Sequence, residues 1–363
     1  MFPDKNTYFS DKTMRILSIG TFSDIGVSNT CLHRTWALEK TGHVTRIDST
    51  LNRHVLPYRI INRLFVRYKL PVSFHVPPLN KAIIKAIHAQ HFDMVWIDKG
   101  IFIEARTLKE IKRVQPGCTI VGYSPDNMAE RHNQSQIFLN SFPYYDFYVT
   151  TKSYTVETLK GMGCKDIIFV NNAYEATFHH PYKISIGEKN SLGGKIGFIG
   201  AWEEERCRSI LYLAEHGVPV RVWGGGKWLQ YKNHCPNLTI EKSGLYSEDY
   251  AKALSAFDIS LCFLRKMNYD LQTTRTMEIP ACGSLLMAER TPEHEQLFKD
   301  KEEAVFFSSD QELLDLCRYY IAHDDERKRI AMAGRARCIK SCYSNEETIK
   351  GIIKTILQQQ KQG

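Results

Sequence analysis

Short apolar runs and amphipathic stretches alternate along the first half of the chain. The apolar runs predict buried strands over residues 14–19, 44–48, 94–97, 120–123, 145–150 and 167–170. Apolar residues three and four positions apart predict helices over 31–40, 79–90, 107–114 and 153–162. Regular alternation of strand and helix is typical of a parallel sheet covered by helices, so we predict a doubly wound domain.

The pattern restarts after a polar stretch, residues 178–194, which ends in two glycines and reads as a linker. Strands are predicted over 195–199, 219–223, 238–241, 259–264, 284–288 and 304–307. Helices are predicted after the AWEEER segment and over 247–256, where Ser247 is the expected cap, 292–298, 311–323, 326–338 and 344–360. We therefore expect an α/β protein of two tandem Rossmann-like, doubly wound domains, 1–180 and 195–342, with a terminal segment 343–363. Each domain would turn its ligand-binding edge toward a shared cleft.

The stretch from Asp270 to Gly283 joins a loop of small polar residues to the start of a helix. The loop residues are Gln272, Thr273 and Thr274. Unpaired backbone N–H groups and the helix dipole make such a helix start an anion site. Arg275 could add a bidentate bond to a phosphate, and the carboxylate of Glu278 suits the two hydroxyls of a ribose. We therefore expect this stretch to bind a nucleotide-sugar.

Two other features of the second half each admit two interpretations. Arg206 follows three glutamates at the start of a predicted helix, where it could reach a phosphate or form a salt bridge within the helix. Gly224 is the first of three glycines that follow a predicted strand. These glycines could let the backbone approach a ligand closely, or they could simply turn the chain.

In the first half, two strand ends carry candidate ligand-binding residues. Asp126 follows the strand 120–123, where a catalytic residue would be placed; an Asx turn or a helix cap is the alternative. The loop after the first strand contains Gly20, Asp24 and Gly26 but lacks a full dinucleotide-binding fingerprint. Asp24 and Gly26 would face the crevice between the domains, unless this loop is an ordinary tight turn.

Residues 53–70 form a basic amphipathic segment. Arg59, Arg63 and Arg67 are four residues apart and share a helical face, whereas Ile60, Ile61, Leu64 and Phe65 are expected on the other face. Such a helix could rest on an anionic membrane or contact a phosphorylated acceptor. A solvated helix face is the alternative, which we favour.

Composition narrows the class of protein. Of the 363 residues, 43% are hydrophobic and 24% are charged, which is typical of a folded globular chain. The formal charge of +8 favours acidic partners such as phosphates, but it is too small and too dispersed to indicate nucleic acid. The ten cysteines show no zinc-ligand spacing, and we expect reduced thiols in a cytoplasmic protein. The polar N-terminus does not look like a signal peptide.

Several segments resemble the C-terminal half of group 1 glycosyltransferases. They are RTMEIPACGSLLMAERTPEHEQLF, IAMAGRARC, IGFIGAWEEER and VRVWGGGKW, and the resemblance is closest to the CgeB-like, spore-maturation-type branch. IGTFSDIGVSNT, VWIDKG and GYSPDN in the first half resemble that branch more loosely. The resemblance implies the glycosyltransferase B fold, with the last helix crossing back onto the first domain.

The resemblance also implies roles for particular residues. The family carries an acidic residue eight positions before a glutamate, and Asp270 and Glu278 hold those places. Glu278 would then bind the donor ribose and Asp270 would approach the sugar. The other expected donor-side positions are Gly200, Arg206, Trp223, Gly224, Gly244, Leu245, Arg275 and the backbone amides of Gln272, Thr273 and Thr274. Two departures are the aspartate at 270 and LQTT in place of the usual glycine-rich loop.

A metal-independent glycosyltransferase follows as the first hypothesis, because the sequence contains no Asp-x-Asp motif that would hold a cation beside a diphosphate. Arg206 and Arg275 would neutralise the leaving group, and Asp126 would position or deprotonate the hydroxyl of a glycan, lipid-linked or protein acceptor. Family analogy favours retention of anomeric configuration, and no cofactor is expected. A nucleotide-sugar epimerase and a non-catalytic nucleotide-sugar-binding partner protein are the alternatives. We expect a cytoplasmic location, with residues 53–70 as the segment that could contact the inner face of the membrane.

Overall fold

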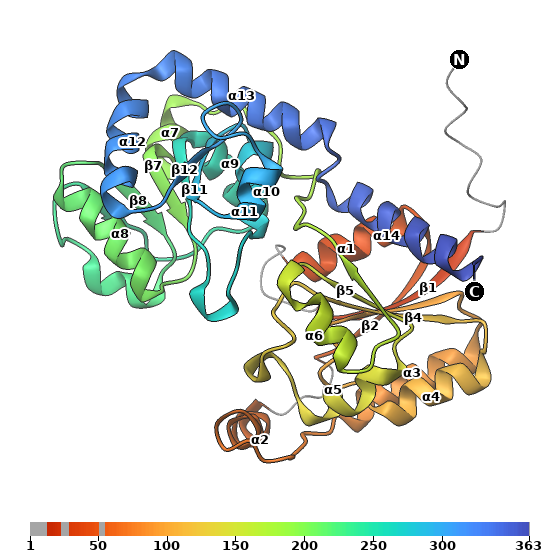
Figure 1. Cartoon of the computed structure of the whole chain (residues 1–363). Helices are drawn as coiled ribbons and strands as arrows, with labels where there is room; N and C mark the ends of the chain where they lie inside the picture. Colours follow the sequence, from red (N-terminus) through yellow and green to blue (C-terminus); the bar gives the residue numbers. More distant parts are fainter. Residues whose placement is uncertain (1–12, 23–28, 51–54, 363) are drawn as a thin grey trace, which may run out of the picture. The chain divides into compact units, whose positions relative to one another are not determined.

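A computed structural model of the chain describes residues 13–22, 29–50 and 55–362. They form two compact units (Figure 1). Unit 1 contains the described residues up to Val170 together with 349–362, and unit 2 contains 171–348. The first unit therefore ends ten residues before the predicted boundary at 180, and the polar stretch after it belongs to the second unit.

Unit 1 is built on a six-stranded parallel sheet with the order β2-β1-β3-β4-β5-β6. The strands are β1 (Met14–Gly20), β2 (Gly42–Asp48), β3 (Met94–Asp98), β4 (Thr119–Ser124), β5 (Phe147–Thr150) and β6 (Asp166–Phe169). The helices are α1 (Thr30–Glu39), α2 (Val55–Arg67), α3 (Pro77–Ala89), α4 (Ala105–Val114), α5 (Gln136–Ser141), α6 (Val156–Gly161) and most of α14 (Asn345–Gln360).

The two faces of this sheet bury separate apolar clusters. Helices α3, α4 and α5 cover one face, with Ile83, Leu108 and Phe138 fully buried against it. Helices α1 and α14 cover the other, where Leu38 and Ile353 pack against the sheet. Figure 1 shows these two groups of helices on opposite sides of the strands. The apolar runs of the sequence are thus strands buried on both faces, as a parallel sheet requires.

Unit 2 has a second six-stranded parallel sheet, with the order β12-β11-β10-β7-β8-β9. Its strands are β7 (Gly194–Ile199), β8 (Val220–Trp223), β9 (Leu238–Ile240), β10 (Phe257–Cys262), β11 (Leu285–Glu289) and β12 (Val305–Phe307). Its helices are α7 (Ile186–Leu192), α8 (Glu204–Glu215), α9 (Ser247–Ala256), α10 (Thr274–Ala281), α11 (Pro292–Leu297), α12 (Asp310–Ala322) and α13 (Asp324–Lys340). Residues from α8, α12 and α13 pack on one face of the sheet, and residues from α9 and α10 pack on the other. Each unit therefore has the predicted α/β, doubly wound architecture.

Three local predictions are wrong. The predicted linker contains α7, because Ser185 and Glu188 form a capping box that starts a helix in a polar stretch. Ser247 is not the cap of α9; Tyr246 occupies that position and no side chain caps the helix. Ile60 is 56% exposed rather than on the inner face of α2, because Phe65, which is buried, sets the rotation of that helix.

Candidate functional site

The order of strands in unit 2 creates one point where the winding of the chain reverses. It lies between β7 and β10, which are neighbours in the sheet although they are far apart in sequence. Ligands of open α/β sheets bind outside the carboxyl ends of the strands at such a point. The residues that follow β7 include Gly200 and Arg206, and those that follow β10 include Arg265 and the start of α10.

The backbone after β7 is shaped to receive an arginine. The guanidinium of Arg275 donates from Nε to the carbonyl of Ile199 at 2.8 Å. A Cβ atom on Gly200 would lie 2.7 Å from Nη2 of Arg275, so a residue with a side chain there would displace the guanidinium. Gly224 packs against the same turn, since its own Cβ would lie 2.3 Å from the Gly200 carbonyl. The first of the three glycines therefore supports the turn, which is the second of the two interpretations offered for it.

Three arginines and one glutamate meet at this edge. Arg206 donates to Glu203 at 2.9 Å, and Arg265 donates to the other carboxylate oxygen of Glu203 at 3.0 Å. The guanidiniums of Arg206 and Arg275 both lie over the ring of Phe198, 5.6 and 5.7 Å from its centroid. Glu203 therefore pairs with two of the three arginines, whereas Arg275 bonds a backbone carbonyl, and the excess of positive charge attracts an anion.

Arg206 is the most constrained member of the cluster. It is 3% exposed, and it forms the salt bridge within its helix that was one of its two predicted roles. Burial and the neighbouring charge of Arg275 lower its pKa, and the carboxylate of Glu203 opposes that shift. Its Nε atom is buried and has no hydrogen-bond partner among the described residues. A phosphate oxygen would relieve both the repulsion and the unpaired donor.

Helix α10 begins beside this cluster. Thr273 caps it, and the amide of Thr273 donates to Oγ1 of Thr276 at 3.1 Å. The next two N–H groups, those of Thr274 and Arg275, have no carbonyl acceptor within a helix. The side chain of Gln272 is buried, and its Oε1 accepts from the backbone N–H of Asn172 at 2.9 Å. Of the predicted diphosphate-binding amides, that of Thr273 is therefore already paired with Thr276, whereas that of Thr274 belongs to the first turn of the helix.

Glu278 lies one turn further along α10 and is largely buried. It is 7% exposed, and its Oε2 accepts a hydrogen bond from the hydroxyl of Tyr250 at 2.7 Å. The ring of Tyr250 packs edge-on against the ring of His179, with centroids 5.7 Å apart. Burial lowers the pKa of His179, whereas the negative charge of Glu278 acts to raise it. Tyr250 fixes the direction of the carboxylate.

The other predicted donor-side residues lie in the loops at the same end of the sheet. Asp270 is partly buried three residues before the cap of α10. Gly244 and Leu245 form the partly buried loop before α9, and Leu245 packs against the apolar cluster beneath that helix. The indole N–H of Trp223 donates to the carbonyl of Leu192 at 3.0 Å, and its partly buried ring packs against the same apolar cluster.

In unit 1, Asp126 follows β4 at the carboxyl edge of the sheet. Its carboxylate accepts from Nζ of Lys99 at 2.7 Å, and its backbone N–H donates to Oγ of Ser124 at 3.1 Å. Lys99 follows β3 and has a φ of 60°, a left-handed conformation that is unusual for a residue other than glycine. Unusual backbone of this kind is concentrated at functional sites.

A buried ion pair lies beside this edge. Asp98, the last residue of β3, is bonded to Arg34 of α1, and both side chains are 7% exposed. The indole of Trp96 donates to Asp98 at 3.2 Å, and Arg34 lies 4.3 Å over the ring of Tyr123. Because β3 and β1 are neighbours where the winding of this sheet reverses, Asp98 and Lys99 sit where a ligand of unit 1 is expected.

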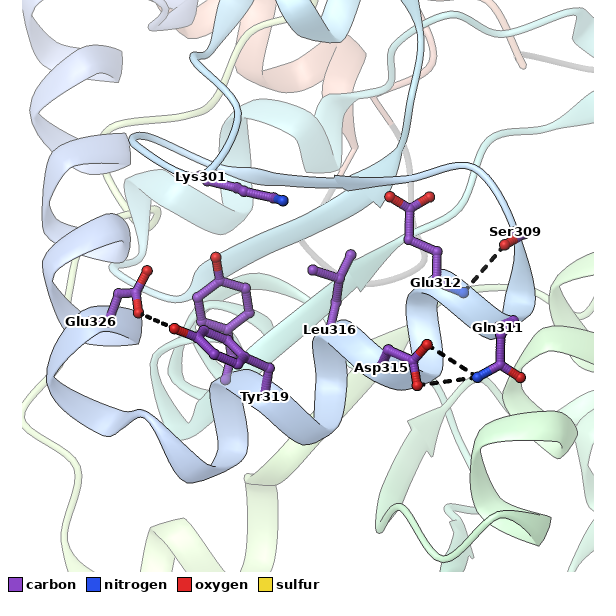
Figure 2. A pocket seen from close by; sticks show the side chains of 9 residues that line it. Lys301, Ser309, Gln311, Glu312, Asp315, Leu316, Tyr319 and Glu326 are labelled. Carbon is purple, nitrogen blue, oxygen red and sulfur yellow. Dashed lines mark hydrogen bonds between the residues drawn. The ribbon is translucent and has the colours of Figure 1, made fainter.

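Two of the predicted residues are not described, and a surface recess along α12 contains none of the others. Asp24 and Gly26 lie outside the described residues. Figure 2 shows a recess along α12 lined by Lys301, Tyr319 and several acidic side chains. In it Gln311 donates to Asp315 and Tyr319 donates to Glu326, at 3.1 and 2.8 Å. None of the predicted site residues lines it.

Sequence reasoning missed several residues that the structure brings to these edges. They are Arg265 in the arginine cluster, Tyr250 and His179 beside Glu278, and Lys99 beside Asp126. A usable signal existed for two of them, since Arg265 directly follows a predicted strand and Lys99 lies two residues after another. The partners of Glu278 are distant in sequence, and the spacing of residues along the chain does not reveal them.

Comparison with protein families places a match in the second half of the chain. A family model described as glycosyl transferase-like matches residues 201–353. No curated protein matches the chain by sequence. No helix among the residues described is both long and apolar enough to cross a membrane.

Solved structures show the same fold at low sequence identity. Anabaena HepE in complex with UDP-glucose has a TM-score of 0.64 and 12% identity, with 95% of this chain and all of that chain covered. Sucrose-phosphate synthase from Thermosynechococcus elongatus has a TM-score of 0.65 and 13% identity, with 96% of this chain and all of that chain covered. A putative UDP-N-acetylglucosamine 2-epimerase from Listeria monocytogenes has a TM-score of 0.53 and 10% identity, with 97% of this chain and 98% of that chain covered. The chain has the glycosyltransferase B fold.

Proposed function

We propose that the protein is a glycosyltransferase that moves a sugar from a nucleotide-sugar to a hydroxyl acceptor. The observation that carries this proposal is the cluster of Arg206, Arg265 and Arg275 at the reversal point of the unit 2 sheet, where the described contacts pair just two of them with Glu203. The family match over 201–353 includes this cluster. The likeness to HepE, whose structure contains UDP-glucose, supports the same class of donor.

The diphosphate would lie against Arg206, Arg275 and the first N–H groups of α10. As the bond to the sugar breaks, negative charge accumulates on the departing diphosphate, and fixed guanidiniums and amides stabilise it without first having to reorganise. We propose that these groups serve in place of a metal ion. Arg265 is 49% exposed at its side chain and would add charge from the solvent side.

The ribose would lie against Glu278, whose carboxylate is directed by Tyr250. Asp270 would approach the sugar, and the base would rest on the loop of Gly244 and Leu245. On the acceptor side, Asp126 would orient or deprotonate the hydroxyl. Its bond to Lys99 holds the carboxylate in place, and a carboxylate can accept the proton of a hydroxyl.

Retention of configuration, membership of the CgeB-like branch and a cytoplasmic location are parts of the proposal that rest on resemblance. The anomeric outcome can be read directly by proton NMR of the product as it forms. Retention requires that the anomeric configuration of the first product equals that of the donor, and inversion at the earliest time points contradicts it.

The first experiment is a thermal-shift screen across nucleoside diphosphates and nucleotide-sugars. A ligand that binds the native state raises the melting temperature, by an amount that grows with its concentration above Kd. A positive ligand is then incubated with the protein, with and without candidate hydroxyl acceptors, and products are followed by mass spectrometry. No shift with any nucleotide would contradict the proposal.

The likeness to the Listeria epimerase keeps one alternative open. An epimerase would convert the donor with no acceptor present, and NMR would then show a new sugar still attached to the nucleotide. A non-catalytic binding partner would give a thermal shift but no product with any acceptor. The three functions are therefore separated by the same set of incubations.

A further inference from the structure

Helix α2 presents apolar and basic side chains on the same exposed stripe. Leu56 and Ile60 are 69% and 56% exposed. The exposed side chains of Arg59, Arg63 and Arg67 lie three, seven and eleven positions after Leu56, which places all five on one face of the helix. The stripe continues past the helix end, where Tyr68 and Leu70 are 56% and 43% exposed.

The opposite side of α2 is fixed to unit 1. Phe65 is buried, and the ring of Tyr58 packs against Phe74 and Phe102 with centroids 5.8 and 5.3 Å away. Arg131 donates to the carbonyl of Phe65 at 2.7 Å and lies 3.9 Å over its ring. The rotation of the helix is therefore set by its inner face, and the exposure of Leu56 and Ile60 is a consequence of that packing.

The charge of this segment points to an anionic partner. Residues 55–70 carry Arg59, Arg63, Arg67 and Lys69, and they contain no acidic residue. A nucleic acid would match these charges but would leave the aliphatic side chains in water. A bilayer with anionic headgroups matches both, because cationic side chains reach the phosphates while aliphatic and aromatic ones enter the boundary with the acyl chains.

We propose that α2 and the residues up to Leu70 form a docking surface for an anionic lipid bilayer, with the helix lying in the plane of the headgroups. Figure 1 shows α2 at the periphery of unit 1, outside the layers that cover the sheet. This surface is independent of the proposed transferase activity. It makes the protein a peripheral membrane protein whatever its substrate.

The test is co-sedimentation of the full-length protein with vesicles. The probes are phosphatidylcholine vesicles and vesicles that contain about one third phosphatidylglycerol. We expect binding to the anionic vesicles at low salt, at least tenfold weaker binding to the neutral ones, and loss of binding as salt rises. Absence of binding to anionic vesicles would overturn the proposal.

Two sets of substitutions separate charge from insertion. The triple change Arg59→Gln, Arg63→Gln and Arg67→Gln should weaken binding at least tenfold, and the pair Leu56→Ser and Ile60→Ser should weaken it severalfold at constant charge. The matched control is Met332→Ser with Ile339→Ser on α13, where the side chains are 70% and 55% exposed. Full binding by the Leu56 and Ile60 variant would mean adsorption without insertion and would overturn the proposed mode.

A contact between two copies of the chain, or with an acidic protein, is the competing use of this face. Light scattering of the wild type and of both variants measures association between copies of the chain directly. If the substitutions change the oligomeric state and leave vesicle binding intact, the surface is a protein interface and the lipid proposal fails. Circular dichroism and melting temperature establish that the exposed substitutions leave the fold unchanged.

Discussion

At the residue scale, the arginine cluster of unit 2 is held together by one acidic side chain. Glu203 accepts from Arg206 and Arg265, while Arg275 is anchored to a backbone carbonyl of β7. This arrangement keeps three like charges close in the absence of a ligand. Part of the free energy of binding an anion then comes from relieving their repulsion.

Replacing Arg275 by Gln should weaken the binding of a nucleoside diphosphate. Loss of one charge-assisted hydrogen bond costs about 1.5–3 kcal/mol, or roughly 10- to 150-fold in Kd. Isothermal titration calorimetry measures this change. Arg329→Gln removes the same charge from an exposed position on α13 and should leave Kd unaltered. Equal affinities for all three proteins would rule out a phosphate-binding role for Arg275.

Glu278 and Tyr250 should act as a unit on the nucleotide. We expect Glu278→Ala to weaken binding of the preferred nucleoside diphosphate by ~1–3 kcal/mol, and Tyr250→Phe to weaken it by about 1 kcal/mol. If Tyr250 acts by orienting the carboxylate, the double variant should bind as weakly as Glu278→Ala alone. Fully additive losses in the titration would show that the tyrosine acts by another route.

Asp126→Asn should separate catalysis from donor binding. The amide cannot take a proton from the acceptor, so kcat should fall by at least tenfold. Donor affinity should stay within about twofold, because Asp126 belongs to unit 1 and the proposed nucleotide site is in unit 2. Steady-state rates and calorimetry on the same preparation test the prediction, and an unchanged kcat would remove Asp126 from the mechanism.

At the scale of elements, α10 is tied to α11 by a buried histidine. Nδ1 of His294 donates to the carbonyl of Glu289 at 2.6 Å, and Nε2 accepts from the hydroxyl of Thr276 at 2.9 Å. The neutral ring therefore has both nitrogens paired. A protonated ring could no longer accept the bond from Thr276, which lies in the first turn of the helix that carries Arg275 and Glu278.

Acidification should therefore destabilise unit 2. Burial lowers the pKa of His294 to about 4, whereas an exposed histidine titrates near about 6.5. Between these values the unfolded chain binds a proton that the folded chain excludes. The free energy of unfolding should thus fall as pH drops from about 6.5 to about 4, by up to about 3 kcal/mol for this residue.

Urea unfolding at pH 7.5 and pH 5 tests this effect. His294→Gln should be less stable at neutral pH and should lose less stability on acidification than the wild type. His88→Gln is the control, because His88 is 48% exposed on its side chain and pairs with Glu110 at 3.0 Å. If the wild type and His294→Gln respond equally to pH, the histidine does not contribute to the dependence.

The packing of α13 onto its neighbours depends on Gly334. A Cβ atom there would lie 2.3 Å from the carbonyl of Glu303 and 3.3 Å from the ring of Pro280. Gly334→Ala should lower the free energy of unfolding by about 1–3 kcal/mol, and thermal unfolding should shift accordingly. The control is Gly187→Ala in α7, where the nearest described atom to the new Cβ would be Ser185 Oγ at 4.0 Å. This substitution should leave the free energy of unfolding unchanged or raise it slightly. A Gly334→Ala variant as stable as the wild type would contradict the close packing.

At the scale of the whole molecule, most strands and helices could be predicted because both sheets are buried on both faces. The apolar runs that this requires are visible in the sequence, and the polar loops between them mark the strand ends where ligands bind. Glu278, Arg275 and Asp126 could be named as candidates for that reason. The fold class followed from the same alternation.

What could not be predicted depends on contacts between residues that are distant in sequence. The rotation of α2, and hence the exposure of Ile60, is set by Phe65, Tyr58 and Arg131 rather than by the pattern within the helix. The inward direction of Gln272 depends on Asn172, a hundred positions earlier. Helix α7 escaped notice because its stability comes from a capping box in a stretch with few apolar residues.

Unit 1 is discontinuous in sequence, and this has a consequence for biosynthesis. Ile349, Ile352, Ile353 and Ile356 complete one apolar face of its sheet, yet they leave the ribosome after every residue of unit 2. The described part of unit 2 is one continuous segment, so unit 2 can fold while that apolar face of the unit 1 sheet is still exposed to water. Unit 1 is therefore synthesised mostly before unit 2 but completes its fold after it. Until α14 has left the ribosome, unit 1 must avoid aggregation or rely on a chaperone.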